Sequence, residues 1–451
     1  MSFTQVPHEI QLHIFGYLLN DYAALLNVSQ TSTHLRACAL QLLRTCRTLD
    51  LSKGITDGIE AVLSNLHELA SNGTPPPPHA PFTSLGDLLG DNIVGHASRY
   101  NSLKVFFGNR VGATGEDTQA IVPDDMNIFI LMMQVLTGKT RRELRSWRKN
   151  FRLRKVEPSL RLILYAMRHV RTLELGGSAK CPPWKMEGML TTLRTLKLYD
   201  ITNNQLTRHC CTLAAQPGLI SLEFSDMNVT LGFLEHFKPS TPIMSLRFTR
   251  CWVPKLALTR VIRACSNLVT FEYTLDTARS EAQPYQVRQW QTGKLLSDLR
   301  RHAHTLKHLK IVRLGTTTTR FWLECDHVGS LAVFNALETL TVNPELLAPH
   351  HDACHVQDDC SRRADMVAVL FRAPQSLQTL RLVRCNNTVI ARLSRVVASM
   401  GLSGLLSNLR DLDIAYTTPL NTLQRNLGQP ELALRDAFGR RGVDVKFSHS
   451  P

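Results

Sequence analysis

Leu193-Arg-Thr-Leu196-Lys-Leu198 is one of three similar stretches, the others being Leu219-Ile-Ser-Leu222-Glu-Phe224 and Ile243-Met-Ser-Leu246-Arg-Phe248. Each has apolar residues at its first, fourth and sixth positions. Because alternate side chains of a strand point to the same face, the fourth and sixth positions predict a short strand that buries one face. The polar residue between them is predicted to be exposed.

The spacing of these stretches indicates a repeat array. With neighbouring copies included, the fourth positions are 23, 26, 24 and 25 residues apart, at Leu173, Leu196, Leu222, Leu246 and Phe271. A period of about 20–29 residues is typical of leucine-rich repeats, which this set resembles in a divergent form. One unit is too small to bury its own apolar face, so we expect a curved parallel sheet with helices outside. An ordinary α/β domain with parallel strands is the alternative fold.

Other copies of the apolar triplet extend the array in both directions. One lies near the N-terminus, four follow the regular series at longer intervals, and the last predicts a closing strand. These copies are Cys46/Leu49/Leu51, Leu306/Leu309/Ile311, Leu337/Leu340/Val342, Leu377/Leu380/Leu382, Leu409/Leu412/Ile414 and Val443/Val445/Phe447.

Two further features fit a repeat array. Leu256 to Ala264 has the spacing of a helix that covers the preceding strands. Cys251 and Cys385 stand where leucine-rich repeats carry a buried Asn or Cys. We therefore interpret both cysteines as residues of the repeat core.

The first 45 residues predict a separate helical module. Pro7 suits the first turn of a helix, and apolar residues then recur with helical spacing. They form two stripes, one through Ile10 and Ile14 and the other through Leu12 and Phe15. Two more short helices are expected to follow. A module this small cannot bury both stripes alone, so one should pack on the rest of the chain or on a partner.

The N-terminal module resembles the F-box, the three-helix module that docks on the Skp adaptor of SCF-type ubiquitin ligases. The resemblance is carried by Val6-Pro7-x-Glu9-Ile10-x3-Ile14-Phe15-x2-Leu18, followed by Asp21, Leu25 and Val28-Ser29. It implies that a set of apolar residues faces or supports the adaptor: Val6, Pro7, Ile10, Ile14, Leu18, Leu25 and Val28. With the repeats, the chain is similar to fungal F-box proteins with C-terminal leucine-rich repeats.

The predicted fold class is α/β, with an N-terminal three-helix F-box followed by a curved leucine-rich-repeat-like solenoid with a parallel sheet. Ser71–Pro81 is rich in proline, which cannot donate ladder hydrogen bonds and favours an extended chain. The predicted domains are 1–47, the F-box; 48–82, a connector with the Pro-rich segment; 83–169, an irregular region with a basic segment; and 170–451, the leucine-rich-repeat-like array.

Composition excludes several classes of protein. With 43% hydrophobic and 20% charged residues, the chain can form a core and is not disordered as a whole. The densest apolar stretch, Ile128–Leu136, is shorter than the ~20 residues of a membrane-spanning helix, so no membrane association is expected. Eleven cysteines without a C-x-x-C pair, and an N-terminus without a signal pattern, predict a cytoplasmic and/or nuclear protein.

Lys139–Lys155 holds much of the chain's net charge of +15. It carries nine Lys or Arg residues against Glu143 alone, which gives a local net charge of +8. Leu144, Trp147 and Phe151 are spaced for one helix face, with the basic side chains on the other. Three interpretations remain: an import signal, a site for a partner, or a solvated basic face. Nucleic acid is not favoured as the partner.

The sequence shows no assembled catalytic set. Gly138-Lys139-Thr140 lacks the upstream glycine of a phosphate-binding loop, and no nucleophile elbow or dinucleotide loop occurs. His350–Cys360 is dense in His, Cys and Asp, but it has no paired metal-binding knuckle. We interpret it as an inserted surface loop, and we expect no metal and no cofactor.

The family resemblance implies the substrate-recognition subunit of an SCF-type E3 ubiquitin ligase. The F-box would hold the Skp-type adaptor and through it a cullin, while the repeats would bind an unknown protein substrate. Such a chain is not itself an enzyme, because ubiquitin is transferred elsewhere in the complex by proximity. The exposed positions expected to contact substrate are Arg194, Glu223, Arg247 and Arg381. The alternative is a leucine-rich-repeat interaction scaffold without a role in ubiquitin transfer.

Overall fold

The computed structural model divides the chain into two compact units, Met1–Leu219 (unit 1) and Ile220–Pro451 (unit 2). The predicted F-box helices lie outside the described residues. The structure describes residues 46–50, 102–107, 140, 142–152, 164, 170–177, 190–200, 213–214, 216–227, 229, 240–276, 292–314, 331–347, 373–385, 390, 393–394, 406–416 and 428–449.

Unit 1 contains strands that pair in parallel, each with the next along the chain. They are β1 (Cys46–Asp50), β2 (Ser102–Phe107), β3 (Thr172–Gly177) and β4 (Thr195–Tyr199). The register corrects one prediction. Leu49 pairs with Val105, and Val105 pairs with Leu175. The N-terminal triplet had aligned Leu49 with Leu173 instead, so that alignment was wrong by two residues.

Strand β2 was not predicted, since it lies in the region 83–169 that was interpreted as irregular. Its sequence nevertheless has the same alternation, with apolar residues at Leu103 and Val105 on either side of Lys104. Leu103 is in register with Leu173 of β3. The parallel ladder therefore extends on the N-terminal side of residue 170, where the array had been expected to begin.

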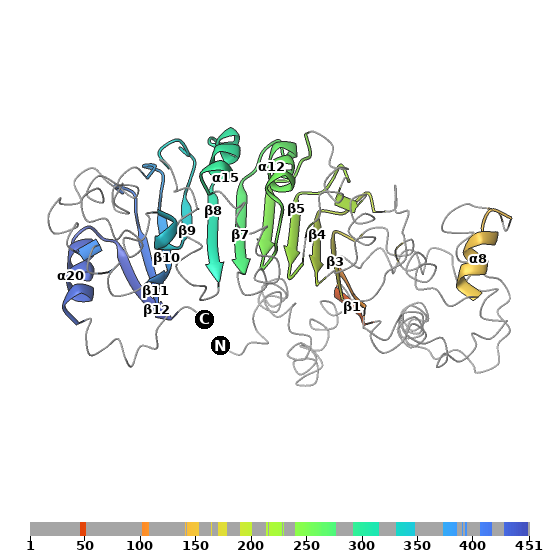
Figure 1. Cartoon of the computed structure of the whole chain (residues 1–451), viewed down its shortest axis with the longest axis horizontal. Coiled ribbons are helices and arrows are strands. Elements are labelled where there is room, and N and C mark those ends of the chain that lie inside the picture. The colour runs from red at the N-terminus through yellow and green to blue at the C-terminus, as the bar shows by residue number, and fades with distance from the viewer. Residues whose placement is uncertain are drawn as a thin grey trace, which may run out of the picture. The chain divides into compact units, whose positions relative to one another are not determined.

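Unit 2 contains a longer series of parallel strands, again paired in chain order (Figure 1). This arrangement confirms the predicted parallel sheet and is consistent with a repeat solenoid. The strands are β5 (Ser221–Ser225), β6 (Ser245–Thr249), β7 (Thr270–Asp276), β8 (His308–Leu314), β9 (Thr339–Val342), β10 (Thr379–Cys385), β11 (Asp411–Tyr416) and β12 (Asp444–His449).

The apolar triplets form the core of both units. In the nine triplets from Val170/Leu173/Leu175 to Leu409/Leu412/Ile414, every apolar side chain is no more than 5% exposed. Strands β4, β5 and β6 alternate between buried and partly exposed residues, as a strand with one covered face should. The periodicity of the sequence therefore identified the buried face correctly.

Backbone hydrogen bonds outside the strands also join successive repeats. The carbonyl oxygen of Met244, just before β6, accepts the N–H groups of Val269 and Thr270 at 2.8 and 2.9 Å. At the other strand end, Arg250 has a φ of 52°, and its N–H donates to Thr274 O at 2.8 Å. These bonds satisfy backbone N–H and C=O groups that would otherwise have no hydrogen-bond partner at the ends of the strands.

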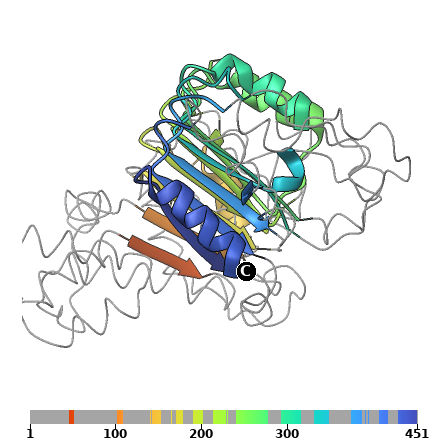
Figure 2. The same ribbon diagram turned by 90° about the vertical axis from the view of Figure 1, so that its left-hand side faces the viewer.

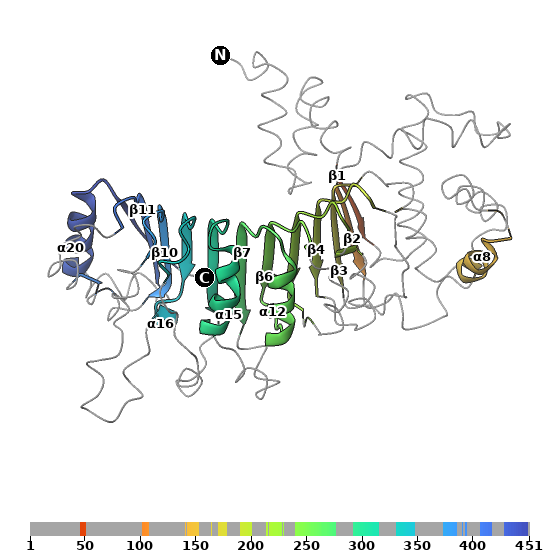
Figure 3. The same ribbon diagram turned by 90° about the horizontal axis from the view of Figure 1, so that it is seen from above.

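Helices lie on one side of the unit 2 strands, where Figures 2 and 3 show α12, α15 and α16. Among the described residues of unit 2, the helical elements are α12 (Lys255–Ala264), α15 (Thr292–Leu299), η4 (Arg300–His302), α16 (Pro344–Leu347) and α20 (Gly428–Gly439). The predicted covering helix is thus confirmed as α12, which buries Ala257, Leu258, Val261 and Ile262. Leu256, the first residue of the predicted range, also lies in α12, but its side chain is 52% exposed and does not cover the strands.

The two cysteines predicted as core residues are buried. Cys251 is 1% exposed, and its thiol donates to Thr249 O at 3.3 Å. Cys385 is fully buried, and its thiol lies 3.6 Å from Leu382 O. Each buried thiol therefore bonds to a backbone carbonyl of a strand, β6 for Cys251 and β10 for Cys385, in agreement with a place in the repeat core.

A buried histidine joins η4 to α12. His302 is 2% exposed; its Nε2 lies 3.0 Å from Ile262 O, and its Nδ1 accepts the N–H of Leu268 at 3.4 Å. The carbonyl requires a proton on Nε2, and the N–H requires a free lone pair on Nδ1. Only the neutral imidazole satisfies both partners. Burial lowers the pKa of His302 below its ordinary value, and the charge of Arg301 acts in the same direction.

We expect unit 2 to lose stability as the pH falls below about 6.5, the ordinary pKa of histidine. The unfolded chain then binds a proton that folded His302 rejects, so the unfolded state is favoured until the lower folded pKa is also passed. The measurement is the urea midpoint of the full chain between pH 8 and pH 5. The variant His302→Asn should be less stable at pH 8 but should show a shallower decline. An equal decline in both proteins would contradict this role for His302.

Candidate functional site

The exposed face of the unit 2 strands carries a row of polar side chains, all but one of them charged, at the central position of each strand. We call this the central row. Each member lies between the two inward apolar residues of its triplet, which are buried in every strand except β12, and neighbouring members are in register. Its members are Glu223, Arg247, Glu272, Lys310, Thr341, Arg381, Asp413 and Lys446.

Opposite charges in the central row form ion pairs across the strands. Arg247 Nε lies 3.3 Å from Glu272 Oε1, and Lys310 Nζ lies 3.5 Å from Glu272 Oε2. Arg381 Nε lies 2.9 Å from Asp413 Oδ2. Each of the three cationic side chains is more than 40% exposed. Exposed ion pairs are individually weak, so the charges of a partner could replace them.

Unit 1 has a related but more buried cluster on β3 and β4. Glu174 is 3% exposed; its carboxylate lies 3.0 Å from Lys197 Nζ and accepts a hydrogen bond from the Tyr199 hydroxyl. The Tyr199 ring covers Gly176, where a Cβ atom would lie 2.4 Å from the ring. Glycine is therefore required there by the close approach of the aromatic ring. The cluster fixes the register of β3 and β4 rather than leaving charges open to a partner.

The structure places three of the four residues predicted to contact substrate on the same face of the unit 2 strands. Glu223, Arg247 and Arg381 are all members of the central row. Arg194 lies in unit 1, just before β4, and its guanidinium Nη1 donates to Gly218 O at 3.0 Å. It therefore stabilises a turn and is not at the central position of its strand. The residues predicted to contact the adaptor lie outside the described residues.

Sequence reasoning missed other members of the same face. Glu272, Lys310 and Asp413 occupy the same position in their triplets as Arg247, so the repeat alignment could have found them. Immediately before β5 and β6, Ile220 and Met244 are 38% and 41% exposed, and the N–H of Met244 donates to Ile220 O at 2.8 Å. The surface of these repeats therefore combines the paired charges of the strands with two exposed apolar side chains at the strand ends, and protein-binding surfaces commonly combine polar and apolar residues.

The basic segment of unit 1 forms helix α8 (Arg145–Arg152). Thr140 and Glu143 precede it as a capping box, in which Glu143 Oε2 accepts the Thr140 N–H at 2.7 Å and Thr140 Oγ1 accepts the Glu143 N–H at 3.4 Å. Leu144 is buried, whereas Arg145 and Lys149 are exposed. These residues agree with the predicted apolar and basic faces, whereas the side chains of Trp147 and Phe151 lie outside the described residues.

Buried titratable groups in the described residues serve packing. Burial raises the pKa of the Cys265 thiol to about 12, so it remains protonated at neutral pH and is not activated as a nucleophile. Burial also raises the pKa of Tyr416, whose hydroxyl donates to Glu431 Oε1 at 2.8 Å. Among the described residues, no group of His, Cys, Asp and Glu is placed to hold a metal ion. The segment His350–Cys360 lies outside them.

No described helix is long and apolar enough to cross a bilayer. The chain matches no curated protein. One family model, described as F-box-like, matches residues 3–50. This match agrees with the resemblance seen in the first 45 residues and ends at the last residue of β1. Residues 3–50 are therefore an F-box-like domain, which supports a role for this chain as an adaptor-binding F-box protein.

Proposed function

We propose that the chain is the substrate-recognition subunit of an SCF-type E3 ubiquitin ligase, acting in the cytoplasm or the nucleus. The observation that carries this proposal is the F-box-like match to residues 3–50. F-box domains generally bind Skp-type adaptors, and the adaptor links them to a cullin. The seven apolar residues predicted to contact the adaptor all lie within the matched range.

The parallel strands supply a second element of the proposal. The exposed strand face of unit 2 would bind a protein substrate, with Glu223, Arg247 and Arg381 among the contacts. Because the cations of this face are already paired with Glu272 and Asp413, a substrate would have to exchange these pairs for its own charges. Its selectivity would then depend on the order of charges along the central row. Arg194 would act indirectly, through the turn that it stabilises.

In this mechanism, the chain contributes position rather than bond chemistry. Holding substrate and adaptor on one polypeptide raises the effective concentration of the substrate near the ubiquitin-transferring enzyme. No residue of this chain would need to act as a nucleophile or base.

Adaptor capture tests the proposal. The double substitution Ile10→Asp plus Ile14→Asp should abolish capture of the chain by an immobilised Skp-type adaptor, because it places two charges in an apolar contact. The central-row variant Arg247→Glu should be captured like the unmodified chain. Hydrogen exchange of β5–β7 should be unchanged in both proteins, which shows that the strands remain folded.

Two results would contradict the proposal. Failure of the unmodified chain to bind the adaptor would favour the alternative function, an interaction scaffold without a role in ubiquitin transfer. Undiminished capture of the double variant would show that the adaptor binds elsewhere.

A further inference from the structure

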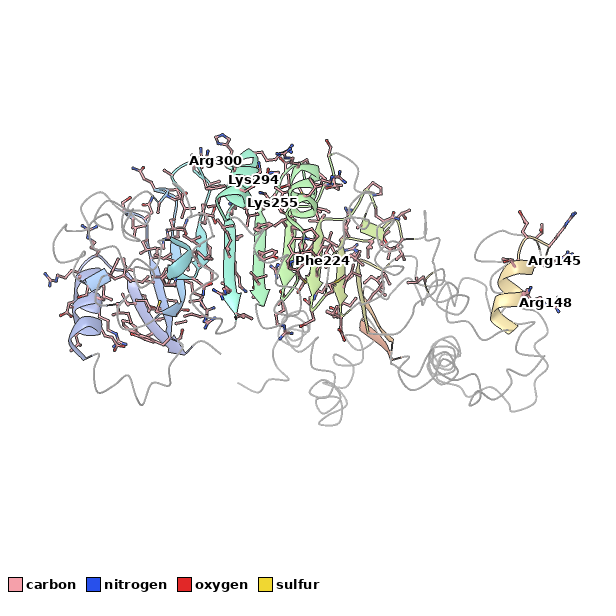
Figure 4. The ribbon with its side chains drawn as sticks, in the orientation of Figure 1. Arg145, Arg148, Phe224, Lys255, Lys294 and Arg300 are labelled. Carbon is pink, nitrogen blue, oxygen red and sulfur yellow. The ribbon has the colours of Figure 1, made fainter. Side chains whose placement is uncertain are left out.

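The exposed surface of α12, α15 and η4 in unit 2 is strongly basic. These elements contain six Lys or Arg residues and one carboxylate, a net charge of +5. We call the six exposed cations the basic helix surface: Lys255, Arg260, Arg263, Lys294, Arg300 and Arg301. Figure 4 shows Lys255, Lys294 and Arg300 at the helix-bearing edge of unit 2. With Lys139–Lys155, this surface accounts for most of the chain's +15.

The single carboxylate of these helices already forms bonds within unit 2. Asp298 is 6% exposed; its Oδ1 lies 3.0 Å from Arg263 Nη2, and its Oδ2 accepts the Thr259 hydroxyl at 2.6 Å. No other described carboxylate forms an ion pair with Arg260, Lys294, Arg300 or Arg301. The adjoining sequence 277–291 contains two arginines and one glutamate, so its charge does not neutralise the surface.

The bonds of Asp298 also make the surface a fixed platform. They connect α15 to two residues of α12 that are one helical turn apart. His302 connects η4 to the last turn of α12 through Ile262 O. The backbones that carry the cations are thus held together before any partner arrives, which reduces the entropy lost on binding.

The cationic side chains on the two sides of unit 2 differ in how far they are paired with carboxylates. On the strand face, Arg247, Lys310 and Arg381 each lie within 3.5 Å of a carboxylate oxygen. On the helix side, the excess of positive charge is left exposed. A repeat array could pair these cations with acidic residues at neighbouring exposed positions, as it does on its strands. For Arg260, Lys294, Arg300 and Arg301, which form no ion pair with a described carboxylate, the contrast favours a different molecule as the source of the complementary carboxylates.

An exposed leucine selects the chemical class of that molecule. Leu256 is 52% exposed and lies one turn before Arg260 on α12, so the two side chains share a helix face. A phosphate backbone offers an aliphatic side chain little to contact. The described residues of α12, α15 and η4 also include no exposed aromatic side chain on which a base could stack, since the imidazole of His302 is buried. The combination favours a protein segment over nucleic acid.

We propose that the basic helix surface binds an acidic protein segment that places an aliphatic side chain against Leu256. This site lies on the helix side of the sheet, opposite the strand face, and it does not depend on the proposed role in ubiquitin transfer. The chain would thereby engage two partners at once, one on each side of unit 2.

The test measures binding of the full chain to a fluorescein-labelled synthetic peptide of glutamate and leucine, by fluorescence anisotropy. The double variant Arg260→Glu plus Arg300→Glu should raise the Kd about tenfold, because two attractions become repulsions. The matched control Arg145→Glu plus Lys149→Glu, on α8, changes the net charge equally and should leave the Kd within about twofold. Leu256→Ser should weaken the binding of this peptide. It should not change the binding of a second peptide in which serine replaces each leucine.

Several outcomes would overturn the proposal. An equal loss of affinity in the α8 control would show that the peptide binds through general charge attraction and not at this surface. A Leu256→Ser variant that binds both peptides like the unmodified chain would remove the apolar contact. A DNA duplex that binds more tightly than the peptide, and loses affinity in the Arg260/Arg300 variant, would assign the surface to nucleic acid.

Discussion

Replacing Phe224 with alanine should lower the free energy of unfolding by about 3–5 kcal/mol, the range for a large aromatic residue in a core. Phe224 is fully buried on the inward face of β5 (Figure 4). Its ring stacks on Phe248 of β6 at a centroid distance of 5.0 Å and an interplanar angle of 4°. Phe248 in turn contacts Phe271 and Tyr273 of β7 at 6.4 and 5.8 Å. The substitution therefore opens a cavity at one end of an aromatic row that spans three repeats.

The measurement is urea unfolding of the full chain followed by circular dichroism, with hydrogen exchange of β5 and β6. Because each repeat is stabilised chiefly by its neighbours, exchange should accelerate in β6 as well as in β5. Ile220→Ala, a few residues earlier, is the matched control and should cost less than about 0.5 kcal/mol, since Ile220 is 38% exposed. A loss below 1 kcal/mol for Phe224→Ala would show that the aromatic row does not hold these repeats together.

The apolar triplets were predictable because burial leaves a period in the sequence. An inward side chain at the fourth and sixth positions must be apolar in every repeat, and this requirement does not depend on how the repeats are aligned with one another. Phe224, Phe248 and Phe271 were found in this way. The stacking of these rings was not predicted. It depends on the register of adjacent strands and on side-chain rotamers, and neither can be read directly from one sequence.

The errors near the N-terminus have a related cause. β1 was aligned from Leu49 and Leu51, whereas the structure places Leu49 level with Val105. An isolated copy of a short apolar pattern has no neighbour at a regular interval to fix its register. β2 was missed for the same reason, although Leu103 and Val105 repeat the alternation.

The candidate sites were predictable only in part. The exposed position between two buried ones identified Glu223, Arg247 and Arg381 as surface residues. Their pairing with Glu272 and Asp413 became visible only with the strand register. The basic helix surface is still less evident in the sequence, because its two main helices are separated by β7 and its cations are spread over nearly fifty residues.

Replacing Asn343 with alanine should lower the free energy of unfolding by about 2–4 kcal/mol. The role of this residue is one that a repeat pattern cannot predict. β9 ends at Val342, so it pairs with only the first part of β8 and of β10, which both run three residues further. Beyond the end of β9, the fully buried Asn343 side chain supplies hydrogen bonds that a longer strand would have made with β8 and β10. Its Oδ1 accepts the Arg313 N–H at 2.6 Å, and its Nδ2 lies 3.4 Å from both Arg313 O and Val383 O.

Alanine would leave these three backbone groups without the amide that bridges them, in a place where 0% of the Asn343 side chain meets solvent. The measurement is hydrogen exchange at the end of β8, where the Arg313 amide should exchange at least tenfold faster, together with the urea midpoint. Asn343→Asp, measured at a pH where the carboxyl is ionised, is the informative control, because it keeps an acceptor for the Arg313 N–H but has no proton to donate to either carbonyl. A carboxylate facing two carbonyl oxygens should be no better tolerated than alanine. If Asn343→Ala left both readouts unchanged, water would have to be replacing the amide, and the short β9 would need no side chain to complete it.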